Sequence, residues 1–280
     1  MPELPEVETI VREIRPRLVG RTLRSPRLYH RDVLRGVTAP RLLRALRNAD
    51  VVALRRRAKH VVIELDSGMR MVIQPRMTGS LLVYDRRLDS DERRYAVLEA
   101  SIGDGARVVF RDVRRLGTIH LLDASSWSAY ERDIGPEPLA RQFTAARLAD
   151  CISGSRQAIK KVLMDQRRLA GIGNIYAQEA LFRARLDPSR PADRLTPADV
   201  QRLYDALREV LRTSIRRRGT TVRDYRTGTG EAGSFQDALE VYGRGGEPCV
   251  RCGSTLAETH AIDGRTTTFC WRCQGAPAGR

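Results

Sequence analysis

Four cysteines near the C-terminus constrain the fold of this chain more than any other feature. They form two pairs, Cys249-x2-Cys252 and Cys270-x2-Cys273, separated by the 17 residues 253–269. Two such pairs at this separation offer four thiolates to one tetrahedral Zn²⁺ ion. Because four cysteines leave no open coordination position, we expect a single structural zinc rather than a catalytic one. A redox-active pair of dithiols is the less favoured alternative.

The residues around the two pairs predict a zinc ribbon over residues 244–274. Between the pairs, residues 262–269 contain an Asp-Gly turn followed by β-forming residues, which is typical of a hairpin. Arg265 would then lie at the tip of that hairpin. The fifth cysteine, Cys151, stands alone in an apolar helical pattern, and we expect it to pack in a core.

The composition favours a nucleic-acid partner. The chain has 280 residues, 41% of them hydrophobic, and it carries 50 lysines and arginines against 34 acids, a net charge of +16. Such an excess indicates a polyanionic partner, although a generally basic proteome is an alternative. No apolar stretch approaches the roughly 20 residues of a membrane span, and the charged N-terminus is unlike a secretory signal. We therefore expect a cytosolic protein.

The first six residues carry a second chemical signal. The chain begins Met1-Pro2-Glu3-Leu4-Pro5-Glu6, and methionine is normally removed before proline. An α-amine has a pKa of about 8. An N-terminal Pro2 would therefore be a partly deprotonated secondary amine, able to form an iminium with a sugar carbon. Glu3 could move protons for that amine. Taken alone, the same residues favour an ordinary helix start, because proline and acids suit a first helical turn.

The periodicity divides the chain into β-rich and helical parts. After a helix that starts near Pro5, residues 20–125 alternate short β-forming runs with turns, which predicts an antiparallel sandwich or barrel. We expect an α+β protein with an N-terminal β-sandwich domain (1–132), a linker (133–140), a helical DNA-binding domain (141–240) and a zinc finger (241–280). The expected strands are 51–54, 60–65, 69–73, 80–84, 95–98 and 107–110, and the expected helices of the second half are 143–152, 157–165, 175–184 and 197–217.

A glycine turn precedes one of these helices. In Leu169-Ala-Gly-Ile-Gly-Asn-Ile-Tyr176, Gly171 and Gly173 allow a tight backbone, and Asn174 would cap the helix that follows. A helix N-terminus after such a turn binds anions through its free N–H groups, and a DNA phosphate is a candidate. A simple bend between two helices explains the motif equally well.

Four motifs together make the chain resemble one family. They are MPELPE at 1–6, RRRAKH at 55–60, GIGNIYA at 171–177 and the two cysteine pairs. With these motifs the chain closely resembles bacterial formamidopyrimidine-DNA glycosylases, whose family also holds endonuclease VIII. The resemblance extends over essentially the whole chain. It implies a β-sandwich, a helix-two-turn-helix region and a zinc finger, with damaged duplex DNA held in the cleft between them by a monomeric protein.

The resemblance also implies an activity and its residues. The family removes oxidised purines, 8-oxoguanine and formamidopyrimidines, through a Schiff base and then cleaves the strand by β- and δ-elimination. Pro2 would be the nucleophile and Glu3 would protonate the sugar ring oxygen, while Lys59 and Arg265 would act at the scissile phosphates. Arg114 would read the orphaned cytosine between the apolar wedges Met77 and Leu116. Further DNA contacts are expected from Arg156, Lys160 and Asn174. Glu6 would contact the sugar or a water, or would cap the helix.

Some residues depart from the family pattern. Gln74-Pro75-Arg76 stands where the family typically has His-Leu-Gly, and Val113 and Leu116 replace a proline and a phenylalanine. Leucine stacks less well than phenylalanine, so we expect a weaker wedge. Residues 223–235 match the loop that covers the flipped base.

Two other functions stay open. One is an endonuclease VIII-like activity on oxidised pyrimidines. The other is a non-catalytic zinc-containing DNA-binding protein, against which the intact Pro2-Glu3 argues.

Overall fold

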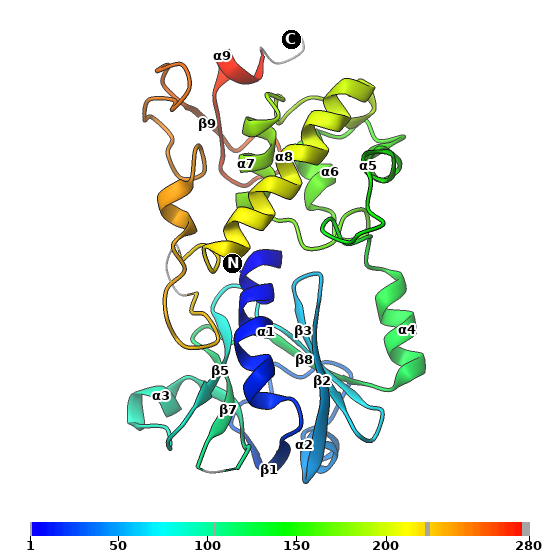
Figure 1. Ribbon diagram of the computed structural model, residues 1–280, viewed down its shortest axis with the longest axis vertical. Helices are drawn as coiled ribbons and strands as arrows, with labels where there is room; N and C mark the ends of the chain where they lie inside the picture. Colours follow the sequence, from blue (N-terminus) through cyan, green and yellow to red (C-terminus); the bar gives the residue numbers. More distant parts are fainter. Residues whose placement is uncertain (1, 104, 222–224, 276–280) are drawn as a thin grey trace. The chain divides into compact units, whose positions relative to one another are not determined.

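The chain forms two compact units. The computed structural model describes residues 2–103, 105–221 and 225–275. One unit comprises Met1–Arg132 with Ile215–Gln236, and the other comprises Asp133–Ser214 with Asp237–Arg280 (Figure 1). This division therefore joins 215–236 to the β-rich unit and leaves the cysteine-rich segment with the helices. Whether the expected segments 1–132, 133–140, 141–240 and 241–280 fold as separate domains stays a prediction.

The N-terminal unit is built on eight antiparallel strands in the order β5-β7-β6-β1-β2-β3-β4-β8. Strand β1 belongs to both halves, because Thr22 pairs with β2 whereas Arg24 and later residues pair with β6. A register shift between Arg24 and Arg27, with Ser25 at φ +48°, bends β1 from one layer to the other. The predicted β-sandwich is confirmed. Its strands are β1 Thr22–Leu28, β2 Ala49–Arg57, β3 His60–Leu65, β4 Arg70–Gln74, β5 Gly79–Tyr84, β6 Ala96–Ser101, β7 Arg107–Asp112 and β8 Thr118–Leu122.

Two of these strands lie in the region expected to be β-rich but are not among the six runs named from the sequence. The six predicted strands match β2 to β7 within a few residues, but β1 and β8 have no predicted counterpart. Strand β1 reads Thr-Leu-Arg-Ser-Pro-Arg-Leu and lacks regular alternation, because its bulge interrupts the two-residue period. Strand β8 holds only five residues and follows a polar loop.

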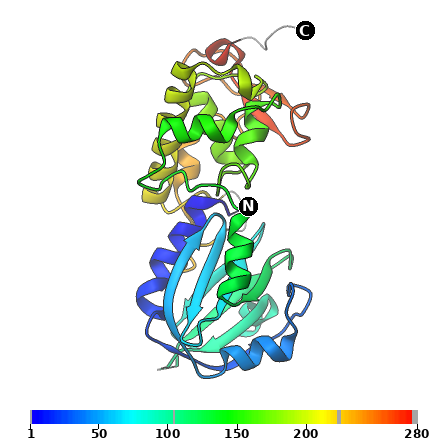
Figure 2. The ribbon, with the colours of Figure 1, turned by 90° about the vertical axis from the view of Figure 1, so that its right-hand side faces the viewer.

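Helix α1, Leu4–Leu18, packs along the strands of this unit. Its apolar side chains Val7, Ile10, Val11 and Leu18 are fully buried, as their helical spacing predicts. The helix packs against β2, β3 and β5, and it lies with β5 on one side and β2 on the other (Figure 1). Figure 2 shows α1, in dark blue, along one side of the strands. The remaining helices of this unit are α2 Ala39–Leu46, α3 Ser90–Arg94 and α4 Ala124–Arg132.

The second unit is helical and ends in a hairpin. The four helices predicted for this half are present within a few residues, and the C-terminal hairpin is confirmed, although its first strand is β9 rather than part of 262–269. No helix among the described residues is both long and apolar enough to cross a membrane. The elements are α5 Ala145–Ile152, α6 Ile159–Met164, α7 Asn174–Arg183, α8 Pro197–Arg216, β9 Ala257–Thr259, β10 Thr267–Phe269 and α9 Trp271–Gln274, with 3-10 turns at Ala192–Arg194 and Phe235–Ala238.

Helix α7 anchors the cysteine-rich segment. The carboxylate of the fully buried Glu179 accepts hydrogen bonds from the backbone N–H groups of Glu240, Val241 and Tyr242 at 2.9–3.2 Å. Phe182 of the same helix packs in an apolar cluster with Val241 and the buried cysteines. The segment just before the first cysteine pair is therefore attached to α7.

Candidate functional site

The predicted nucleophile and acid lie at the start of α1. Pro2 is buried and Glu3 is the N-cap residue, with only 2% of its surface exposed. The backbone N–H of Glu3 donates to Glu6 Oε2 at 2.8 Å, and the Glu3 carboxylate in turn accepts from the backbone N–H of Glu6. This reciprocal capping box fixes the Glu3 carboxylate at the first turn of α1, one residue after Pro2 in the chain.

Glu6 is an internal tether rather than an exposed contact residue. It is 1% exposed, and its second oxygen, Oε1, accepts from the backbone N–H of Thr220 at 2.8 Å. The Tyr225 hydroxyl donates to the Glu6 carbonyl at 3.1 Å, and burial together with the Glu6 charge raises the pKa of Tyr225 well above its usual value. The capping role that was one expectation for Glu6 is therefore present, and its contact with DNA stays a prediction.

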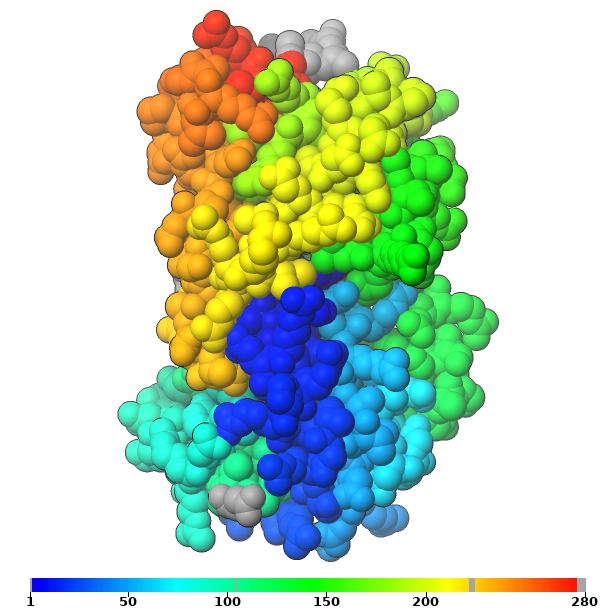
Figure 3. All heavy atoms as spheres, viewed as in Figure 1, coloured from blue at the N-terminus to red at the C-terminus, as the bar shows by residue number. Residues whose placement is uncertain are grey.

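The segment that follows Thr220 lies against α1. Of the predicted loop 223–235, residues 225–235 are described, and 223 and 224 lie outside the described residues. Glu13 of α1 accepts from Arg218 Nε at 2.8 Å and from the Thr229 backbone N–H at 3.1 Å. Figure 3 shows the outer face of α1 in blue with the gold-to-orange segment beside it. Sequence reasoning missed Glu13, since an acid on a helix surface carries no signal of its distant partner.

Lys59 lies in the turn between β2 and β3. Arg57 pairs with His60, so Ala58 and Lys59 form a two-residue hairpin turn, with Ala58 at φ +52°. Lys59 is 7% exposed. Because α1 packs against both strands, the tip of this hairpin and the N-terminal end of α1 lie at the same end of the unit (Figures 1 and 2). Pro2, Glu3 and Lys59 are thus carried by elements in contact.

The neighbouring His60 is locked in its neutral form. Burial lowers the pKa of His60 to about 4. Its Nδ1 lies 3.1 Å from the Arg57 carbonyl, which can only accept, so Nε2 accepts from the Tyr130 hydroxyl at 3.0 Å. The imidazole therefore braces the turn that carries Lys59 against α4. No sequence signal connected His60 with Tyr130.

The predicted wedge residues are exposed as the resemblance implied. Met77 and Leu116 are 45% and 44% exposed, although their apolar character alone would have placed them in a core. Val113 and Arg114 are also exposed. Large exposed apolar side chains on adjacent loops are typical of a binding surface. Their role in DNA remains a prediction.

A buried acid, Asp112, joins the two wedge loops. Its Oδ2 accepts from the Gly117 backbone N–H at 2.7 Å, and its Oδ1 accepts from the Arg114 backbone N–H at 3.2 Å and from the Thr78 hydroxyl. A Cβ at Gly117 would lie 2.7 Å from the Phe110 ring, so only glycine fits there. Asp112 therefore makes the loops of Met77 and Arg114 one rigid surface. Sequence reasoning missed it, because an acid at the end of a strand carries no sign of its burial or of its distant partner Thr78.

In the second unit, Lys160 is buried. It is 0% exposed, and its Nζ donates to Asp263 Oδ1 at 3.0 Å and to Thr267 Oγ1 at 2.7 Å. Burial lowers the pKa of Lys160, whereas the Asp263 carboxylate opposes that change. The Lys160 ammonium group is thus enclosed by partners within the protein, and its predicted phosphate contact stays a prediction.

Three other predicted site residues belong to the second unit. Asn174 is the first residue of α7, and Gly173 rather than Asn174 is its N-cap, which corrects the capping prediction. The Asn174 side-chain amide donates to the Thr266 carbonyl at 3.1 Å. Arg265 lies exposed between β9 and β10, as predicted for the hairpin tip. Arg156 is exposed in the loop before α6.

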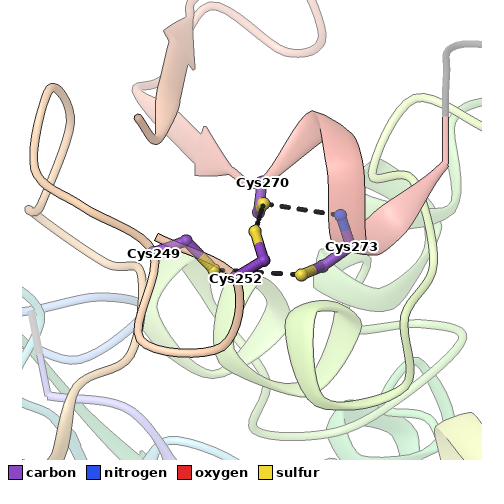
Figure 4. Close-up of side chains that lie close together, drawn as sticks. All are labelled: Cys249, Cys252, Cys270 and Cys273. Atoms are coloured by element: carbon purple, nitrogen blue, oxygen red, sulfur yellow. Dashed lines mark hydrogen bonds between the residues drawn. The ribbon is translucent and has the colours of Figure 1, made fainter. Parts of the chain in front are cut away.

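The four paired cysteines form one cluster. Their Sγ atoms all lie within 4.8 Å of one another, with Cys249 3.9 Å from Cys273 and Cys252 3.5 Å from Cys270 (Figure 4). A tetrahedral metal with metal–sulfur bonds of about 2.3 Å requires sulfur–sulfur distances of about 3.8 Å. Disulfide bonds are excluded, because they require about 2.05 Å. The predicted metal-binding cluster is therefore confirmed as a site that could hold an ion.

Two family models match this chain. Residues 1–119 match the formamidopyrimidine-DNA glycosylase N-terminal domain, and residues 134–226 match the formamidopyrimidine-DNA glycosylase H2TH domain. The first match ends within β8, and the second covers helices α5 to α8 and ends at residue 226.

Known proteins resemble the chain over nearly its full length. The formamidopyrimidine-DNA glycosylase of Chloroflexus aurantiacus is 39% identical over 274 residues, which are 98% of either chain. The Lactococcus lactis Fpg in complex with DNA containing an abasic site has a TM-score of 0.89 at 30% identity, covering 97% of this chain and 99% of the other. A variant of that protein with Fapy-dG DNA also gives 0.89, at 31% identity and coverage of 98% and 99%.

Proposed function

This chain belongs to the formamidopyrimidine-DNA glycosylase family, and we propose that it excises oxidised purines from duplex DNA and then cleaves the strand. The observation that carries the proposal is the capping box at the start of α1, which fixes the carboxylate of Glu3, the residue that follows Pro2. The names of the relatives favour this activity over one on oxidised pyrimidines. The DNA in the solved Lactococcus lactis complexes supports damaged DNA as the partner.

Base removal begins with a flipped nucleotide. Turning the damaged nucleotide out of the stack costs a few kcal/mol and brings its C1′ to the protein. After loss of Met1, the Pro2 nitrogen attacks C1′, and the bond from C1′ to the base breaks with its electron pair leaving on the base. The proton that the amine gives up on forming the new bond neutralises the departing base. Glu3 donates a proton to the sugar ring oxygen as the ring opens, which leaves a Pro2–C1′ iminium.

The iminium then permits strand cleavage, the lyase part of the proposal. It withdraws electrons from C2′, so that loss of a C2′ proton expels the 3′ phosphate. Loss of a further proton, from C4′, expels the 5′ phosphate. Lys59 and Arg265 place positive charge at these phosphates, and their cationic side chains suit oxyanions that develop as each bond breaks. The abasic-site DNA bound by Lactococcus lactis Fpg supports this second reaction.

The rigid surface made by Asp112 would occupy the gap left by the flipped base. Met77 and Leu116 supply apolar wedges, and Arg114 hydrogen-bonds the opposite cytosine. Arg114→Ala should relax the preference for cytosine opposite the lesion by about 1–3 kcal/mol of discrimination. Relative kcat/KM on 8-oxoguanine paired with each base measures this. An equal loss on all four duplexes would make Arg114 a phosphate contact instead.

The metal proposed for the cysteine cluster is one structural Zn²⁺. Four sulfur donors at the observed separations suit tetrahedral zinc, and they leave no position for substrate. When bound, the ion would hold the knuckles from which the β9–β10 hairpin extends.

Borohydride trapping tests the whole proposal. Processed protein, an 8-oxoguanine:cytosine duplex and borohydride should give a covalent adduct that peptide mass analysis places on Pro2. Pro2→Gly should retain some trapping, because glycine still presents an amine. A matched duplex with an oxidised pyrimidine should trap far more slowly. An adduct located on a lysine would refute the N-terminal nucleophile, and preferential trapping on the pyrimidine duplex would refute the substrate class.

A further inference from the structure

Asp263 lies two residues before Arg265 and touches its backbone. Asp263 Oδ1 accepts from the Arg265 backbone N–H at 3.2 Å and from Lys160 Nζ at 3.0 Å. The Asp263 side chain is 8% exposed and the Lys160 side chain is 0% exposed. The buried Lys160–Asp263 ion pair is therefore hydrogen-bonded to the backbone N–H of the exposed Arg265.

Lys160 reaches the other side of Arg265 through Thr267. Its Nζ donates to Thr267 Oγ1 at 2.7 Å, and the Thr267 hydroxyl donates to the Arg265 carbonyl at 3.3 Å. Both backbone polar groups of Arg265 are therefore linked to one ammonium group of α6, through one intermediate side chain each. Two bonds of this kind restrict the backbone dihedrals from which the guanidinium projects.

The other polar contacts of the hairpin act on different residues. The side-chain amides of Asn174 and Gln178 donate to the Thr266 carbonyl, and the Thr268 backbone N–H donates to Gln178 Oε1 at 2.7 Å. These bonds hold β10 on α7. The Lys160 contacts are the ones that reach Arg265.

We propose that Lys160 and Asp263 are positioning residues, which aim the exposed Arg265 guanidinium at a DNA phosphate through the two ends of its own peptide backbone. The inference rests on the proposed function, in which Arg265 contacts phosphate. Burying a lysine costs desolvation, and a buried ion pair is a weak device for stability alone. A functional arginine, in contrast, gains from a support that restricts its geometry.

Salt-dependent binding of a duplex with a tetrahydrofuran abasic-site analogue tests the proposal. Arg265→Ala should weaken binding about tenfold, as for one charge-assisted hydrogen bond, and should flatten the slope of log K against log[salt] by about one. Lys160→Met and Asp263→Asn should each weaken binding and flatten the slope in the same direction. The two substitutions change net charge with opposite signs, so a purely electrostatic effect predicts opposite changes in affinity.

A double-mutant cycle with Arg265→Ala provides the second readout. If Lys160 acts through Arg265, Lys160→Met should have no further effect in the Arg265→Ala background. Lys161→Met removes the same charge from an exposed position of the same helix, and its effect should be the same in both backgrounds. Equal losses for Lys160→Met with and without Arg265 would overturn the inference.

The double variant Lys160→Met with Asp263→Asn is the control for misfolding, because it leaves no unpaired charge buried. Wild-type affinity and slope in this double variant would overturn the inference. A wild-type slope in Arg265→Ala would overturn the phosphate contact and with it the positioning role. Trapping on Pro2 would be unaffected by that result, so failure of the inference and failure of the proposed activity are separable.

Discussion

The N-terminal end of α1 and the tip of the β9–β10 hairpin both present a proposed functional residue, but different forces hold them. Helix α1 places Val7, Ile10 and Ile14 in a large apolar core. The hairpin strands β9 and β10 have three residues each, and the nearby apolar cluster is small and includes the cysteines themselves. The first region depends on buried apolar surface, whereas the second depends on sulfur ligands and polar contacts.

The difference in support has an energetic consequence. Full burial of one aliphatic side chain stabilises a fold by about 1.5–3 kcal/mol, and α1 contributes several such side chains. A ribbon without a core of that size obtains its folding free energy from metal binding. We therefore expect the Pro2–Glu3 end to survive metal removal and the Arg265 tip to lose its position.

The largest expected effect concerns the N-terminal end of α1, where a loss of catalysis can be separated from a loss of folding. Glu3→Gln should lower the single-turnover rate of base excision by about 10²–10⁴-fold, because it removes a general acid. Glutamine still offers an oxygen to the Glu6 backbone N–H, so α1 should remain capped. Circular dichroism and the salt slope of DNA binding should stay at wild-type values. An excision rate near that of the wild type would mean that another group protonates the sugar.

The second effect concerns the stability of the N-terminal unit against acid. Because the pKa of folded His60 is about 4, below its ordinary 6.5, the unfolded chain binds the proton more tightly. His60 therefore contributes stability that is present above pH 6.5 and is lost as the pH falls from 6.5 toward 4, up to about 3 kcal/mol.

His60→Gln should remove this part of the pH dependence. Denaturant unfolding of wild type and variant between pH 4 and pH 7 measures the difference, with Met77→Ala as an exposed control that should keep the wild-type slope. Parallel pH profiles for wild type and His60→Gln would show that His60 is not held neutral.

The smallest expected effect belongs to the metal-dependent region. Cys249→Ser should weaken DNA binding about tenfold to a hundredfold, because the hairpin that carries Arg265 loses one of its four ligands. Unfolding of the N-terminal unit should be unchanged, which a probe on that unit would report. Metal content by mass spectrometry identifies the ion. Full DNA affinity in metal-free protein would remove the contrast between the two regions.

Patterns confined to short stretches of the sequence predicted their structure well. The apolar spacing from Val7 to Leu18 defined α1, and the two cysteine pairs defined the metal-binding cluster. Both signals are local, since a helical face repeats every three to four residues and each cysteine pair spans a single turn. The family motifs added the candidates Pro2 and Glu3, whose roles stay predictions.

Only the tertiary structure decided which polar side chains face inward. Lys160 and Asp263 are 103 residues apart in the chain, and Glu6 and Thr220 are 214 apart, so no local pattern connects them. A lysine or glutamate reads as exposed by default, because burial of its charge is unfavourable without a partner. That partner is supplied by the fold alone, which is why the sequence predicted Arg265 at a hairpin tip but gave no sign that Lys160 and Glu6 are buried.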